Sequence, residues 1–167
     1  MNCPACGAPL RLGAGEESLT CAYCRSIYFP DKNDEGVRVF GEASGEACPV
    51  CAIPLMEASL DGVRICYCTR CRGMLIPMEV FAALIDAVRA GQQGAVVAPA
   101  SDGSELKRRL NCPHCHQTME THFYAGPGHV VIEGCDHCCL NWLDHGELMR
   151  IAHAPEYLRE DAVEEQR

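Results

Sequence analysis

The fold is decided by a stretch that reads Cys112-Pro-His-Cys115, then 19 residues, then Cys135-Asp-His-Cys138. The segment Asn141-Trp-Leu-Asp-His-Gly-Glu-Leu148 follows it after two residues. Each Cys-x-x-Cys turn directs two sulfur atoms toward one point, and a hairpin between the turns brings the two pairs together. The spacing therefore predicts one tetrahedral zinc site held by four thiolates.

The same pattern occurs twice upstream, with 14 residues between the pairs in the first copy and 16 in the second. We name the copies ribbons one, two and three, and each Cys-x-x-Cys turn a knuckle. Three copies in order predict a small metal-stabilised α+β fold: three tandem Cys₄ zinc ribbons built of short antiparallel hairpins, holding three Zn²⁺ ions. The expected ligands are Cys3, Cys6, Cys21, Cys24, Cys48, Cys51, Cys68, Cys71, Cys112, Cys115, Cys135 and Cys138.

The size of the ribbons explains why metal is needed. A unit of roughly 40 residues lies near the size at which a hydrophobic core alone does not hold a fold. A structural zinc site contributes about 10–16 kcal/mol in peptide systems at neutral pH, so folding and zinc binding are expected to be one event. Iron of the rubredoxin kind is the competing metal, but the second knuckles lack the matching Pro and Gly.

Disulfides in a secreted protein are the alternative use of 14 cysteines. The segment Met1–Cys6 has no basic start followed by an apolar stretch, so no signal peptide is expected. We therefore expect a cytoplasmic protein with reduced thiols. No run approaches about 18 consecutive apolar residues, and no membrane span is expected.

Hairpins and helices follow from residue periodicity. Asp61-Gly62 predicts a tight hairpin turn, and two further turns are expected at Gly13-Ala-Gly15 and Gly126-Pro-Gly128. Apolar residues at i, i+3, i+4 and i+7 predict a helix over about 78–90 in ribbon two, with the stripe Phe81, Leu84, Ile85 and Val88. In ribbon three, Asp144 and Glu147 predict a capping box, with Leu148 and Ile151 facing the ribbon.

The expected organisation has six segments: ribbon one (1–30), an acidic connector (31–47) with a short strand at Val37–Phe40, ribbon two with its helix (48–90), a flexible linker (91–106), ribbon three with its helix (107–154) and an acidic C-terminal tail (155–167). As a flexible coil the linker spans roughly 20 Å, which would let ribbon three lie apart from ribbon two.

Charge bears on the partner. Three zinc ions, each held by four thiolates, lower the formal net charge of −9 to about −15. This sign opposes binding to phosphate, because non-specific affinity for nucleic acid comes from Lys and Arg. Two small basic groups are the exceptions, and neither has an aromatic stacking platform beside it: Lys107-Arg108-Arg109 and the trio Arg64, Arg70 and Arg72. We expect solvated surface charge there and a protein as partner.

The motif Cys112-Pro-x-Cys115, Cys135-x-x-Cys138, Trp142-Leu-Asp-x-Gly-Glu-Leu148 resembles the zinc-ribbon family named after the general transcription factor IIB, in its small bacterial form. Ribbon two looks like a diverged copy that keeps Gly73, with Leu75 in the place of the tryptophan and Pro77 in the place of the capping aspartate. Ribbon one matches only as a generic Cys₄ ribbon. The resemblance covers roughly half of the chain and implies zinc binding and a role in transcription or protein assembly.

Glycine is common in this family immediately after a knuckle, and this chain departs from that pattern. Ala52, His116 and Cys139 occupy such positions, so strained knuckles are expected there. Cys139 and Cys66 remain after the ligands are assigned; they are either redox thiols, with Cys66 able to replace Cys68, or small half-buried side chains, and we favour the second interpretation.

The histidines near the knuckles are not needed as metal ligands. His114, His116 and His137 lie in or beside knuckles, but a complete Cys₄ set leaves no vacancy for them in the metal shell. A catalytic zinc keeps one coordination position for water, and four thiolates leave no such position. Asp144, His145 and Glu147 could suggest a catalytic group, but the predicted capping box already accounts for Asp144 and Glu147. We therefore expect no enzyme activity.

The sequence is compatible with three functions. The first, which we favour, is a non-catalytic adaptor whose ribbons bind other proteins, with a link to transcription or its regulation. The second is binding of nucleic acid through the two basic groups. The third is metal storage or thiol redox chemistry.

Overall fold

The computed structural model describes residues 1–12, 17–91, 105–124 and 130–154. Two of the predicted turns, at 13–15 and 126–128, lie outside the described residues. So do most of the predicted linker and the whole acidic tail. Within the described ranges, no helix is long and apolar enough to span a bilayer.

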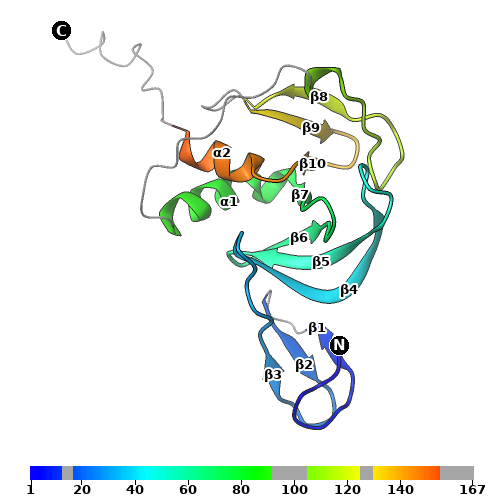
Figure 1. Cartoon of the computed structure of the whole chain (residues 1–167), viewed down its shortest axis with the longest axis vertical. Coiled ribbons are helices and arrows are strands. Elements are labelled where there is room, and N and C mark those ends of the chain that lie inside the picture. The colour runs from blue at the N-terminus through cyan, green and yellow to red at the C-terminus, as the bar shows by residue number, and fades with distance from the viewer. Residues whose placement is uncertain (13–16, 92–104, 125–129, 155–167) are drawn as a thin grey trace, which may run out of the picture.

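Ribbon one forms the lower lobe in Figure 1. Its three-stranded antiparallel sheet has the order β1-β2-β3, with β1 at Leu10–Leu12, β2 at Leu19–Cys21 and β3 at Ile27–Tyr28. Its small core contains Leu10, Leu19 and two of the cysteines, and Phe40 from the next segment completes it. Ribbon one therefore has little apolar packing of its own, as expected of a unit held by metal.

Ribbons two and three share one seven-stranded antiparallel sheet of order β4-β5-β6-β7-β10-β9-β8. Its strands are β4 (Val37–Ala47), β5 (Pro54–Leu60), β6 (Val63–Tyr67), β7 (Met74–Pro77), β8 (Glu120–Phe123), β9 (Val131–Cys135) and β10 (Leu140–Leu143). A short 3₁₀ helix, η1 (Glu105–Lys107), precedes ribbon three. We call this sheet with its two helices the body.

Ribbon three does not lie apart from ribbon two. The last strands of the two ribbons, β7 and β10, pair side by side, with Leu75 opposite Trp142 and Met74 opposite Leu143. Both strands are largely buried, and without this pairing each would be an apolar sheet edge open to other chains. The expectation of separate ribbons was wrong because each ribbon uses the other to cover its last strand.

Alternation along β7 and β10 gives the sheet two different apolar faces. Met74, Ile76 and Leu143 belong to the cluster that packs against the helices. Leu75 and Trp142 point to the opposite face, where they join the cysteines of ribbons two and three in a second cluster. Because successive side chains of a strand point to opposite faces of the sheet, the helices pack on one face and the cysteines of sites two and three lie on the other.

The two helices, α1 (Met78–Gly91) and α2 (Glu147–His153), lie side by side over the first of these faces (Figure 1). The predicted stripe of α1 is confirmed, since the buried residues of this helix are Phe81, Leu84, Ile85 and Val88. Leu148 and Ile151 of α2 are buried as predicted.

The start of α2 differs from the predicted capping box. The helix begins at Glu147 after Gly146, which has φ 83°, and no side chain caps it. The carboxylate of Asp144 instead accepts a hydrogen bond from Trp142 Nε1 at 3.2 Å. Half of the box remains, because the backbone N–H of Asp144 donates to Glu147 Oε2 at 2.7 Å.

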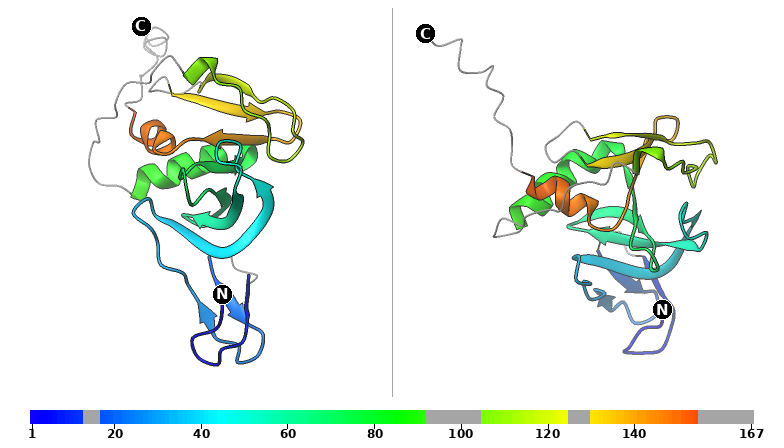
Figure 2. Two further views of the ribbon diagram at one scale, coloured as in Figure 1. Left: turned by 45° about the vertical axis from the view of Figure 1, so that its right-hand side comes forward. Right: turned by 45° about the horizontal axis from the view of Figure 1, so that its top comes forward.

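The predicted connector contains a strand longer than the expected Val37–Phe40. β4 runs for 11 residues along the edge of the sheet, and its pairing with β5 shifts register on either side of Ala43. Gly41 and Gly45 lie at these shifts with φ of 77° and 91°. Such bulges bend a strand, and Figure 2 shows β4, in cyan, strongly curved.

Candidate metal centres

The twelve predicted ligands come together in three groups of four. Within each group, all four sulfur atoms lie within 4.8 Å of one another. The groups are Cys3, Cys6, Cys21 and Cys24 (site one), Cys48, Cys51, Cys68 and Cys71 (site two), and Cys112, Cys115, Cys135 and Cys138 (site three). In each, the two knuckles of one ribbon supply two thiols apiece, as predicted.

The spacing of the sulfur atoms fits zinc. Sγ–Sγ distances are 3.6 Å for Cys3–Cys24, 3.5 Å for Cys6–Cys21 and 3.7 Å for Cys115–Cys135. A tetrahedral ion with Zn–S bonds of about 2.3 Å separates its sulfurs by about 3.8 Å. A disulfide would require about 2.05 Å. All fourteen cysteines are free thiols, so the donor set is four soft sulfur atoms at the distance that Zn²⁺ requires.

The backbone of the knuckles explains how each pair of thiols is aimed. In site one, the N–H of Cys3 donates to the carbonyl of Ala8 at 2.7 Å, and the N–H of Gly7 donates to the carbonyl of Cys3 at 2.8 Å. Knuckles beginning at Cys21, Cys48, Cys68 and Cys112 repeat both bonds. One local geometry is thus used repeatedly, and it turns the chain by hydrogen bonding around the first cysteine.

This geometry requires a left-handed residue directly after the second cysteine. All six such positions have φ between 54° and 74°: Gly7, Arg25, Ala52, Arg72, His116 and Cys139. The strain expected at Ala52, His116 and Cys139 is therefore present. Residues other than glycine pay about 1–2 kcal/mol for this conformation. Arg25 and Arg72 were missed by the sequence analysis, although their position after a knuckle was a sufficient signal.

Hydrogen bonds favour the thiolate form of some ligands. Ser26 Oγ lies 2.9 Å from Cys24 Sγ and 3.2 Å from Cys3 Sγ, and its hydrogen bond lowers the pKa of Cys3 to about 6. The backbone N–H of Gln117 lowers the pKa of Cys115 to about 7. Burial and the neighbouring thiols raise the pKa of Cys71 and Cys138. Four thiolates this close need a cation, which zinc supplies when bound.

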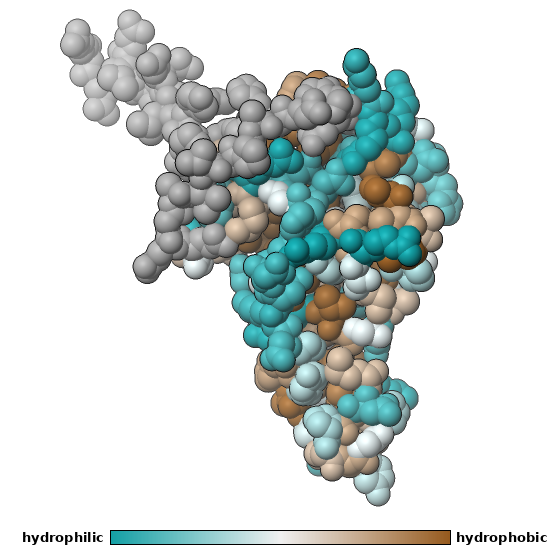
Figure 3. Space-filling view, in the orientation of Figure 1, coloured by the Kyte–Doolittle hydropathy of each residue, from teal (hydrophilic) through white to brown (hydrophobic). Residues whose placement is uncertain are grey.

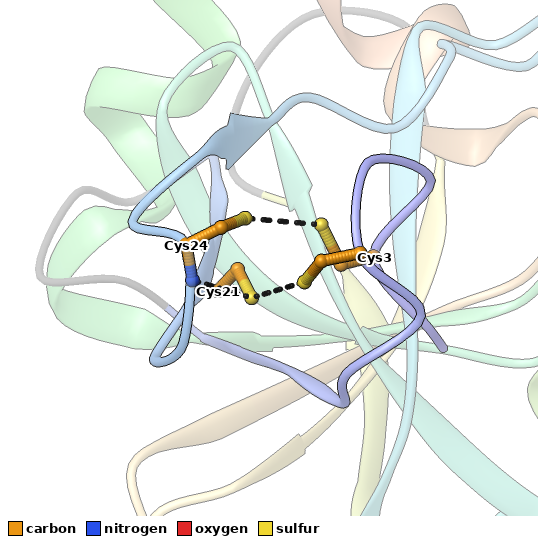
Figure 4. Close-up of side chains that lie close together, drawn as sticks. Cys3, Cys21 and Cys24 are labelled. Carbon is orange, nitrogen blue, oxygen red and sulfur yellow. Dashed lines mark hydrogen bonds between the residues drawn. The ribbon is translucent and has the colours of Figure 1, made fainter.

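The surroundings of the three sites differ. Sites two and three border one apolar cluster that contains Leu55, Leu75, Leu110, Met119 and Trp142. Site one stands alone in ribbon one, where Cys6 and Cys24 are exposed and Cys3 and Cys21 are buried. Figure 4 shows the sulfur atoms of site one facing one another from the two knuckles.

Trp142 connects ribbon three to ribbon two. Its indole is fully buried and lies against the backbone of Gly73, where a Cβ atom would be 2.2 Å from Trp142 Cζ2. The carbonyl of Gly73 accepts a hydrogen bond from the N–H of Cys68 at 2.9 Å. The tryptophan of one ribbon is thus in contact with the knuckle that holds the metal of the other.

A buried ionic network was missed by the sequence analysis. Arg108 donates to Glu133 Oε1 through Nε at 3.0 Å and Nη2 at 2.7 Å, and it also pairs with Asp144. Glu147 is 1% exposed, with Arg150 Nη2 at 3.3 Å. Burial raises the pKa of Glu147 to about 8. No signal in the sequence distinguished Arg108 from its exposed neighbours Lys107 and Arg109.

Two of the three arginines in the second basic group, Arg64 and Arg72, also form intramolecular pairs, whereas Arg70 is exposed. Arg72 pairs with Asp34 and Glu35, and Arg64 lies 3.7 Å from Glu57 and over the ring of Phe40. These side chains are therefore less available to phosphate than an unpaired arginine would be.

The remaining candidates lie outside the three groups. His114, His116 and His137 are exposed, and His114 Nδ1 contacts Glu46 Oε1 at 2.8 Å. Cys66 is half-buried at a cavity of about 150 Å³, and burial raises its pKa. Cys139 is exposed rather than half-buried, and its thiol lies 3.5 Å from the carbonyl oxygen of Asp136.

The fold and the three sulfur groups define a β-rich protein with three Cys₄ zinc ribbons. The family model of the transcription factor IIB-type zinc ribbon, described as a transcription factor zinc-finger, matches residues 47–86. This segment is ribbon two, which the sequence analysis had treated as the diverged copy. No curated protein and no solved structure gives a significant match to the chain.

Proposed function

We propose that this chain is a non-catalytic, zinc-binding adaptor of the cytoplasm whose ribbons bind other proteins, in a process connected with transcription or its regulation. The observation that carries the proposal is the apolar surface of ribbon one. Tyr23, Ile27 and Phe29 are 84%, 62% and 54% exposed. Exposed large apolar side chains that gather on one small unit are typical of protein interaction sites.

The apolar surface is not explained by the folding of ribbon one. Ile27 lies on β3, Phe29 directly follows the last residue of that strand, and Tyr23 lies in the adjoining knuckle, so the three exposed side chains belong to one short segment of ribbon one. The core of ribbon one consists of other residues, among them Leu10, Leu19 and Phe40. In Figure 3, brown and beige residues lie on the visible face of this lower lobe.

Two observations support the choice of a protein as partner. The three sulfur groups form complete four-thiolate shells, which leave no position for a substrate or a catalytic water. Arg64, Arg72 and Arg108, which binding to phosphate would use, pair with carboxylates of the chain itself. The connection with transcription rests on the description of the family that matches ribbon two.

The test is capture of partners from the native host by the zinc-loaded chain and by a variant with Tyr23→Ser, Ile27→Thr and Phe29→Ser. The matched control is Phe123→Ser, which removes a side chain that is 48% exposed on β8 of the body. We expect a protein that the wild type and the control retain and the triple variant loses. Equal capture by all three chains would contradict the proposal.

Nucleic acid is the second candidate, because the family description names a transcription factor and Lys107 and Arg109 are exposed. Electrophoretic mobility shift at two salt concentrations separates the two functions. Contacts to phosphate give binding that falls steeply with salt. We expect no shift even at low salt, and a salt-sensitive shift would favour the second candidate.

A further inference from the structure

The three metal sites differ in how their outer thiols are covered. In every site, one cysteine of each knuckle is buried, and the other is the outer thiol. The outer thiols of site one, Cys6 and Cys24, are exposed. Those of sites two and three are all only partly accessible: Cys51, Cys71, Cys115 and Cys138.

Packing explains the difference. The outer thiols of sites two and three lie against the apolar cluster around Leu75 and Trp142, which the two ribbons build together. Among the described residues, the sheet of ribbon one pairs with no strand of another ribbon. Its own cluster contains the inner thiols, Cys3 and Cys21, but neither outer thiol. A solvent-borne reagent therefore reaches the sulfur shell of site one more readily than that of the other two sites.

We propose that site one is the oxidation-sensitive metal site of this chain, from which a hydroperoxide removes zinc while sites two and three keep theirs. Susceptibility of a cysteine to oxidation follows its thiolate character and its exposure. Thiolate character is common to all three sites when zinc is bound, so exposure decides which of them reacts first.

The geometry supports a two-step reaction. With hydrogen peroxide, the thiolate of Cys24 attacks one oxygen atom; the O–O bond breaks, an S–O bond forms and hydroxide leaves. The thiolate of Cys3, whose sulfur lies 3.6 Å away, then attacks the oxidised sulfur, forms an S–S bond and releases a second hydroxide. Two electrons have passed from the sulfur pair to one peroxide. Cys6 and Cys21, 3.5 Å apart, can react in the same way with a second peroxide.

Loss of two thiolates leaves site one too few charged ligands for its metal. Ribbon one has strands of only two or three residues, so it should lose its structure when the metal is lost. The body keeps its own core and both of its sites. Trp142, the single tryptophan of the sequence, lies in that body and reports on it separately.

The experiment uses the zinc-loaded full chain with Cys66→Ser and Cys139→Ser, which leaves only the ligand thiols, and the wild type in parallel. Hydrogen peroxide is added stepwise while a chromogenic chelator measures released zinc, tryptophan emission follows the body and peptide mapping locates disulfides. We expect one zinc equivalent to leave at least about tenfold faster than the other two. The first disulfides should lie within residues 3–24, with emission unchanged.

Three results would overturn the proposal: equal release rates for all three equivalents, a change in tryptophan emission together with the first equivalent, or first disulfides within residues 48–138. Retention of all zinc at a peroxide excess that oxidises Cys139 of the wild type would overturn it as well. Zinc release is measured without a partner, so the result is independent of the proposed adaptor function.

A second variant tests whether apolar cover is the cause. Leu75→Ala removes part of the cluster that covers sites two and three and leaves all twelve ligand cysteines unchanged. In a variant that keeps the circular dichroism spectrum of the wild type, the second and third zinc equivalents should leave several-fold faster, while the first is unchanged. Unchanged release of the later equivalents would show that cover by the cluster does not protect them.

Discussion

A methyl group added at Gly73 would occupy space that the indole of Trp142 already fills. The new Cβ would lie 2.2 Å from Trp142 Cζ2 and 2.7 Å from Cη2. Carbon atoms in contact are normally about 3.5–4.0 Å apart, so the ring and the backbone would have to separate by more than about 1 Å. Gly73→Ala therefore tests whether this contact joins ribbons two and three.

The size of the effect follows from the lack of room. Overpacking a core typically costs about 1–3 kcal/mol. The upper end applies here, because the indole is fully buried and its Nε1 is hydrogen-bonded to Asp144. Alanine also reduces the freedom of the unfolded chain, which stabilises by up to about 1 kcal/mol. We expect a net loss of at least about 2 kcal/mol.

The assay is urea unfolding of the zinc-loaded chain at fixed free zinc, followed by far-ultraviolet circular dichroism. Gly91→Ala is the matched control, because nothing lies within 4 Å of a Cβ at that exposed position at the end of α1. A surface change of this kind should alter the free energy of unfolding by no more than about 0.5 kcal/mol. Gly73→Ala as stable as the control would refute the contact.

A double variant isolates the clash itself. Phenylalanine lacks the two ring atoms nearest to the new methyl group, so Trp142→Phe should relieve the overlap. Gly73→Ala combined with Trp142→Phe should be less destabilised than the sum of the single variants by at least about 1 kcal/mol. Strict additivity would mean that Gly73 acts on stability by some route other than this ring.

Three further outcomes follow from the buried and strained positions. Burial raises the pKa of Glu147 from 4.5 to about 8, so between these pH values the folded chain holds a proton that the unfolded chain has released. The free energy of unfolding should therefore fall as pH rises through this interval. In unfolding measured as a function of pH, Glu147→Gln should flatten this fall, whereas the control Glu79→Gln, on the exposed surface of α1, should not. Ala52 has a φ of 56°, so Ala52→Gly should relieve strain and raise the midpoint of thermal unfolding by the equivalent of up to about 1 kcal/mol. The control Ala22→Gly should lower the midpoint. A lower midpoint for Ala52→Gly than for Ala22→Gly would argue against strain at Ala52. Cys115→Ser should make ribbons two and three sensitive to limited proteolysis together, while ribbon one stays resistant to cleavage. Cleavage confined to ribbon three would show that the body does not unfold as one cooperative unit.

The metal-binding residues and the local elements could be predicted from sequence because their signals are local. Cysteine spacing marked all three sulfur groups, and the spacing of Phe81, Leu84 and Ile85 marked α1. Asp61-Gly62 correctly marked the turn between β5 and β6. In each case the residues that carry the signal lie within one ribbon, at most 26 positions apart, as in Cys112 and Cys138.

What the sequence analysis missed depends on contacts between distant segments. The pairing of β7 with β10 joins residues more than 60 positions apart, and the apolar strands Met74–Pro77 and Leu140–Leu143 do not specify each other as partners. Arg108 looks like surface charge until β9 brings Glu133 to it. Asp144 satisfies a capping motif, but the indole of Trp142 and Arg108 compete for its carboxylate.

The bends in β4 have a consequence for how this protein behaves in concentrated solution. A straight outer strand invites another molecule to extend the sheet, and the end product of such growth is a fibre. Gly41 and Gly45 break the regular row of backbone donors and acceptors, and Glu42 and Glu46 place negative charge along it. Growth at this end therefore stops with β4, and straightening it by Gly41→Val and Gly45→Val should make the chain prone to aggregate.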